Sequence, residues 1–152
     1  MCTSFLCEVM TATHNFGTSP IRAASTADTF KAALFLASAT INAATTAYST
    51  TGEVTGTNYT AGGVTVTNAT APTSTNSSAT AGVGYWTPSA SFVYTTVTLS
   101  TAFDCVLVYN STQSNKAVSV HTFGSQTITA GTFTLTMPSN TTTTALLRLA
   151  TT

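Results

Sequence analysis

The side chains best suited to catalysis or metal binding are few and scattered along this chain. Its histidines are His14 and His121, and its cysteines are Cys2, Cys7 and Cys105. A zinc site needs four ligands, usually as two close pairs, and the Cys-x4-Cys spacing of Cys2 and Cys7 has no second pair to complete it. We therefore expect no bound metal. His121 is interpreted as a hydrogen-bonded histidine within a strand.

The acidic residues form no recognisable motif either. They are Glu8, Asp28, Glu53 and Asp104, and no spacing marks two of them as a general acid and base. The glycine-rich stretch 56–63 lacks the lysine of a phosphate-binding loop. We expect neither an enzyme nor a cofactor.

Asp104 stands out because it lies inside an apolar segment, FDCVLVYN. A buried carboxylate without a partner is costly. Asp104 is therefore expected to face solvent, or else to pair with Lys116, Arg148 or a neighbouring chain. Its neighbour Cys105 is interpreted as a small hydrophobic residue of the same strand.

The composition favours a protein that works in an assembly. Charged residues make up 5% of the 152 residues and the net charge is zero, whereas about 25% is usual for soluble domains. Threonine, which suits pleated surfaces, supplies 38 residues. The basic residues are too few and too dispersed to bind nucleic acid or an anionic membrane. Neutral surfaces with few charges tend to associate.

The amino-terminal residues do not resemble an export signal. MCTSFLCEVM has no basic start, and Glu8 interrupts its apolar run. No apolar run approaches the length of a membrane-spanning helix. We expect synthesis in the cytoplasm, where the chain stays until assembled, and reduced cysteines.

Alternation and turn residues predict an all-β chain. The expected strands are short, with turns at 62–63, 111–115, Gly124-Ser125 and Ala130-Gly131. They lie at 4–10, 29–36, 64–68, 91–99, 102–110, 116–123, 126–129, 132–137 and 145–150. Residues 29–36 are apolar on both faces, which suits a central strand or one that meets a partner, and a short helix is the competing interpretation.

This pattern predicts one antiparallel β-domain over residues 1–152, built as a β-sandwich or jelly roll, with a small barrel as the alternative. Residues 1–24 form an amino-terminal arm or strand in this interpretation. Residues 71–84, rich in serine, threonine and glycine, form a long exposed polar loop. Gly62 and Gly63 form a structural turn that launches the strand at Val64.

Several segments resemble a family of small virion structural proteins from tailed bacteriophages and prophages. The resemblance covers roughly residues 25–150. It rests on Thr-Phe-Lys-x-Ala-Leu at 29–34, an Ala-Tyr segment ending at Tyr48, and Glu-Val-x-Gly-x-x-Tyr-x-x-Gly-Gly at 53–63. A Tyr-Asn hairpin at 109–110 and a Thr-Phe-Thr-Leu strand at 132–135 follow.

The resemblance implies a structural role in a virus particle. The expected protein is a capsid decoration, or cement, protein on the outer surface of the major capsid protein lattice, self-associated as a dimer or trimer. The alternatives are a tail, tail-tip or head-fibre component that attaches to a host or a fibre, and a secreted adhesin-like domain. The candidate interface residues are Phe5, Phe16, Tyr59, Tyr85 and Trp86.

Overall fold

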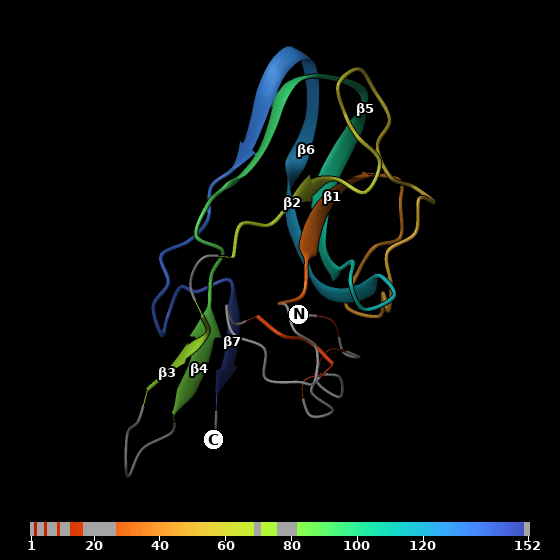
Figure 1. The fold of residues 1–152 in the computed structure, drawn as a ribbon. Helices are drawn as coiled ribbons and strands as arrows, with labels where there is room; N and C mark the ends of the chain where they lie inside the picture. The colour runs from red at the N-terminus through yellow and green to blue at the C-terminus, as the bar shows by residue number, and fades with distance from the viewer. Residues whose placement is uncertain are drawn as a thin grey trace. The chain divides into compact units, whose positions relative to one another are not determined.

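The computed structural model describes residues 2, 5, 9, 13–16, 27–68, 71–75 and 82–150. They form an all-β fold of two antiparallel sheets, which confirms the predicted class (Figure 1). The jelly-roll arrangement stays a prediction. The strands are β1 (Phe30–Leu36), β2 (Val64–Thr65), β3 (Thr73–Ser74), β4 (Val83–Trp86), β5 (Phe92–Asn110), β6 (Lys116–Leu135) and β7 (Leu147–Ala150).

The contacts divide the chain into two compact units, each assembled from three segments. The first unit comprises Met1–His14, Asp28–Val66 and Phe92–Thr134. The second comprises Asn15–Ala27, Thr67–Ser91 and Leu135–Thr152. That the chain behaves as a single domain stays a prediction.

The larger sheet belongs to the first unit and has the order β2-β1-β5-β6. β1 is central, as its two apolar faces predict, and residues 32–35 are all buried. It pairs with the second half of β5, from Phe30 opposite Asn110 to Leu36 opposite Phe103. The short-helix alternative for this segment is therefore wrong.

β5 and β6 are longer than predicted, at 19 and 20 residues. The gap expected between strands at 100–101 lies inside continuous β5, and the turns expected at Gly124-Ser125 and Ala130-Gly131 lie inside continuous β6, so these predictions are wrong. Figure 1 shows both ribbons bending over at the top of the view. Thr96 and Ala130 have positive φ angles of 50° and 47°. Such residues bend a strand without ending its pairing.

An aromatic cluster packs inside this bent hairpin. Phe133 lies 5.1 Å from Phe103 and 5.3 Å from Phe123 between ring centroids. Tyr94 lies 6.1 Å from Phe133. Because Phe103 and Phe133 come from distant parts of β5 and β6, these contacts hold the two halves of the hairpin against each other.

The second unit contains the sheet β3-β4-β7. Thr73 pairs with Tyr85 and Ser74 with Gly84, so the expected loop 71–84 forms strand pairs at both ends. The loop prediction is wrong for those residues, and 76–81 lie outside the described residues. Trp86 packs against Phe16 at 4.7 Å between ring centroids and donates a 2.9 Å hydrogen bond to Asn68 Oδ1.

The predicted first strand, 4–10, is wrong at both of its described residues. Phe5 and Val9 have helical conformation, and the remaining positions lie outside the described residues. The backbone N–H of Cys2 donates to the carbonyl of Val118, at 3.0 Å. This bond places Cys2 beside β6.

Candidate functional site

The segment 52–66 lies along β1 and is held there by main-chain hydrogen bonds. Leu36 N–H donates to Gly52 O at 2.9 Å, Val54 N–H donates to Leu34 O at 3.0 Å, and Glu53 forms a β-bridge with Phe35. β2 continues this edge by pairing Val64 with Ala32. The segment therefore has a fixed register on β1, and this register directs the side chain of Glu53 inward.

Glu53 is a buried carboxylate that accepts three hydrogen bonds from neutral donors. It is 6% exposed. Its Oε1 accepts from Tyr59 Oη at 2.8 Å and from Gly62 N–H at 2.7 Å. Its Oε2 accepts from Tyr48 Oη at 2.6 Å. Because a buried carboxylate is tolerated only when its oxygens are satisfied, these bonds make Glu53 the centre of the loop.

The tyrosines around Glu53 are locked in their neutral form. Burial is the main cause that raises the pKa values of Tyr48 and Tyr59, and the nearby Glu53 carboxylate raises them further. Burial also raises the pKa of Tyr109 to about 12. Tyr109 stacks on Tyr48 at 4.4 Å and donates to Gly62 O at 2.9 Å. These hydroxyls therefore remain donors throughout the physiological pH range.

Gly62 and Gly63 shape the turn that brings these groups together. Their φ angles are +90° and +73°, a region that side chains disfavour. A Cβ on Gly63 would lie 1.8 Å from the carbonyl oxygen of Ala32. Only glycine therefore lets the chain pass so close to β1 at this point.

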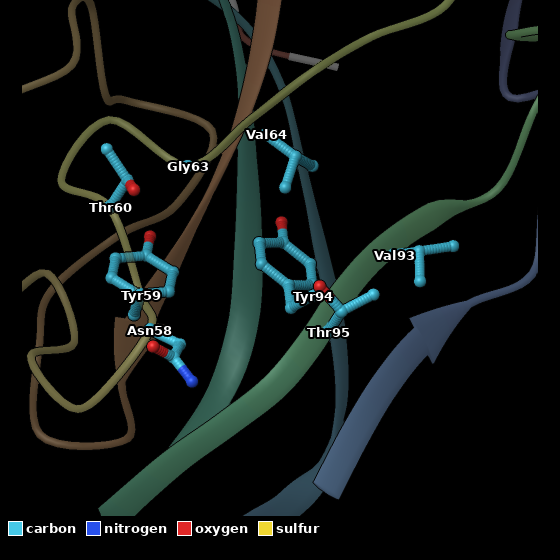
Figure 2. Close-up of a pocket in the computed structure, with 8 residues that line it drawn as sticks. All are labelled: Asn58, Tyr59, Thr60, Gly63, Val64, Val93, Tyr94 and Thr95. Carbon is cyan, nitrogen blue, oxygen red and sulfur yellow. The ribbon is translucent and has the colours of Figure 1, made fainter.

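A small pocket opens beside this loop, between residues 58–64 and the start of β5 (Figure 2). Its volume is about 140 Å³. The lining residues are Asn58, Tyr59, Thr60, Gly63, Val64, Val93, Tyr94 and Thr95. None of the eight carries a charge at neutral pH, and their side chains combine tyrosine rings, hydroxyls, an amide and two valines.

A second buried polar cluster joins β5 to the segment before β1. Asn110 Nδ2 donates to Asp28 Oδ2 at 2.8 Å and lies 3.0 Å from His14 Nδ1. Gln113 Nε2 donates to Asp28 Oδ1 at 3.1 Å. Asn110 Oδ1 accepts from the backbone N–H groups of Thr112 and Gln113, which closes the hairpin turn. This arrangement fixes the β5–β6 turn against residues 14 and 28.

The residues predicted to form an interface occupy different environments. Phe5 and Trp86 are each 2% exposed, so in this conformation their side chains pack inside the chain and leave little surface for a partner. Phe16, Tyr59 and Tyr85 are partly exposed. Tyr59 lines the pocket and binds Glu53, Phe16 packs on Trp86, and Tyr85 lies on β4. Their role in binding a partner stays a prediction.

The remaining candidate residues make ordinary structural contacts. His121 Nε2 lies 2.9 Å from Ser119 Oγ, as expected of a hydrogen-bonded strand histidine, and burial lowers its pKa to about 4. Cys105 is buried, and burial raises its thiol pKa to about 11. Asp104 is partly exposed, in line with the solvent interpretation. Cys7 lies outside the described residues.

Sequence reasoning singled out Glu53, Tyr59 and the two glycines but missed two residues that hold them together. Tyr48 donates to Glu53 from a loop, and Tyr109 donates to the carbonyl of Gly62 from β5. It also missed the cluster of His14, Asp28 and Asn110. The available signal was a lone acid flanked by tyrosines within a glycine-rich loop.

The described residues contain no group of three or more histidine, cysteine, aspartate or glutamate residues that could hold a metal ion. Within the same residues, no helix is long and apolar enough to cross a membrane.

Comparison with known proteins identifies no relative of this chain. No protein family, no curated protein and no solved structure matches this chain.

Proposed function

We propose that this protein is a structural component of a bacteriophage particle, a decoration protein that binds the outer surface of the major capsid protein lattice. The observation that supports this proposal most directly is that the residues behind the family resemblance lie together in the structure. Tyr48, Glu53, Tyr59, Gly62 and Tyr109 come from three parts of the sequence and join in one hydrogen-bonded cluster. This convergence supports the proposal because motif residues that determine a fold are expected to pack together.

The character of β6 also favours assembly. It lies at the edge of its sheet, and its only charged residue is Lys116 at the start. At that start the edge is already paired, because Ala117 N–H donates to the carbonyl of Thr46 and the carbonyl of Val118 accepts from Cys2 N–H. Monomeric proteins usually protect long edge strands with charges or prolines. The rest of β6 has neither, so we propose it as the contact surface with capsid subunits or with further copies of this chain.

In this proposal the protein stabilises the shell by repetition. Each copy contributes a modest interface, and symmetric copies on a lattice act together. The chain carries four basic and four acidic residues, so its binding is expected to depend little on ionic strength.

The direct test adds purified protein to capsids that lack it and measures co-sedimentation and resistance to heat. Binding in many copies with a raised disruption temperature is expected. A variant with Thr127→Lys and Thr129→Lys on β6 should bind at least about tenfold more weakly. Thr57→Lys, which places one charge on an exposed loop residue, serves as the control. Absence of binding by the unaltered protein would refute the decoration role.

A second candidate is a tail, tail-tip or head-fibre component that attaches to a host. The pocket beside Tyr59 favours it, because a host-binding component needs a ligand site. Copy number separates the two candidates: hundreds of copies per particle indicate the shell, whereas a handful indicates a tail or vertex.

A further inference from the structure

We propose that the pocket lined by residues 58–60, 63–64 and 93–95 binds a single neutral sugar ring. This inference is independent of the decoration role, because it concerns a small-molecule site and no capsid contact. The volume of about 140 Å³ is below the range of about 300–1,000 Å³ for drug-sized ligands. It suits one ring and excludes a longer ligand from full burial.

The pocket offers an aromatic wall together with a polar rim. Tyr59 is partly exposed and supplies the accessible ring, whereas Tyr94 is 3% exposed and packs nearly parallel to it, with ring centroids 6.0 Å apart and 19° between their planes. Figure 2 shows both rings with Thr60, Thr95 and Asn58 around them. A sugar ring presents C–H groups on its faces and hydroxyls around its edge. Its face matches a tyrosine ring, and its hydroxyls match the threonine hydroxyls and the Asn58 amide oxygen.

The tyrosine hydroxyls are already used within the protein, which leaves the ring of Tyr59 as the aromatic surface for a ligand. Tyr59 Oη donates to Glu53 Oε1 and accepts from Leu34 N–H at 3.0 Å. Tyr94 Oη donates to Ala32 O at 2.8 Å. Ligand recognition through polar contacts therefore falls to Asn58, Thr60 and Thr95.

The pocket lining supplies no positive charge for an anionic ligand. No lysine or arginine lines it, and the Glu53 carboxylate lies one hydrogen bond behind Tyr59. An acidic sugar or a phosphate would find no cation in the lining to pair with, whereas a neutral sugar needs none.

The walls are held in place before any ligand binds. Asn58 has a φ angle of 61° and is fixed by its Nδ2 donation to Thr96 O at 2.9 Å. Gly63 N–H donates to Thr60 O at 3.0 Å, which closes the turn between them. A preformed site loses little conformational entropy on binding, so even a small ligand can bind measurably.

The test is a titration of the full-length, ¹⁵N-labelled protein followed by amide chemical shifts. The probes are the methyl glycosides of glucose, galactose and N-acetylglucosamine, with glucuronate and tetramethylammonium as charged comparisons. We expect at least one neutral glycoside to bind with a Kd on the order of 1–10 mM. The amides of Thr60, Gly63 and Val64 should shift, and glucuronate should bind at least about tenfold more weakly.

Two variants locate the site. Thr95→Val keeps the shape of the side chain but removes a rim hydroxyl, and it should weaken binding about five- to tenfold. Thr122→Val makes the same change at an exposed position on β6 and should leave binding unchanged. The proposal is overturned if no neutral glycoside shifts these amides, if tetramethylammonium shifts them more strongly, or if both variants behave alike.

Discussion

At the scale of single residues, Glu53 shows how one buried acid can organise a long loop. Its three donors are the hydroxyl of Tyr48 from a neighbouring loop, the hydroxyl of Tyr59, and the backbone N–H of Gly62 in the turn before Gly63. All three donors are neutral, so the charge itself has no counter-ion among them. The hydrogen-bonding capacity of the side chain therefore matters more than its charge.

This reasoning predicts a contrast between two substitutions at position 53. Glu53→Ala leaves three donors without an acceptor and should lower the free energy of unfolding by about 3 kcal/mol. Glu53→Gln keeps an oxygen for Tyr59 and Gly62, and the Tyr48 hydroxyl can rotate to accept from the new amide, so its cost should stay within about 1 kcal/mol. Urea denaturation measures both. Equal losses in the two variants would show that the negative charge is essential.

His121 predicts a loss of stability in acid. Its folded pKa of about 4 lies below the unfolded value of about 6.5. Between these values the unfolded chain binds more protons, so the free energy of unfolding rises with pH and falls on acidification through this window. Because the side chain is only partly buried, we expect a loss of about 1–2 kcal/mol between pH 7 and pH 4.5.

The His121 contribution is isolated by comparison with His121→Gln, which does not titrate. Urea denaturation at several pH values should show that the difference in unfolding free energy between the two proteins changes across the window. Parallel curves would mean that His121 titrates alike in both states.

At the scale of elements, the glycines of the chain are predicted to differ in tolerance. Gly63→Val forces a side chain into the carbonyl of Ala32 at a positive φ angle and should cost more than about 4 kcal/mol or prevent folding. Gly124 lies in β6 with nothing within 4 Å of an added Cβ. Gly124→Val should stay within about 1 kcal/mol. Thermal unfolding compares them, and similar Tm losses would contradict the role of the Gly63 turn.

The elements also show which parts of the fold were readable in the sequence. β1 was predictable because a run that is apolar on both faces suits a central strand. The continuity of β5 and β6 was not, because glycine and serine mark a bend inside a strand as readily as a turn that ends one. β3 was hidden because its two residues have the composition of a loop.

The candidate site was predictable only in part, because some of its residues are far apart in the sequence. Glu53, Tyr59 and Gly62 lie within ten residues of one another, so their grouping was visible locally. Asp28 and Asn110 are 82 positions apart. No local pattern reports such a contact, and it becomes apparent only once β1 pairs with β5.

At the scale of the whole molecule, the interleaving of the two units predicts cooperative unfolding. Each unit takes three segments from the chain, so neither can be released as one continuous piece. Trp86 is the only tryptophan and belongs to the second unit, whereas most tyrosines belong to the first.

Two signals should therefore coincide during urea denaturation. Tryptophan fluorescence reports the second unit, and the circular dichroism of the long strands reports mainly the first. We expect midpoints that agree within about 0.2 M, as for a two-state domain. Midpoints that differ clearly would show two independently stable units.

The pairing of β1 with β5 also has a consequence during synthesis. Phe30 finds its partner at Asn110, 80 positions later in the chain. At about 5–20 residues per second, ribosomes need roughly 4–16 s to make that intervening stretch. Throughout that interval β1, an apolar strand, lacks its native neighbour β5. The nascent chain is therefore expected to need a chaperone at this stage, and its soluble yield should fall when cellular chaperones are depleted.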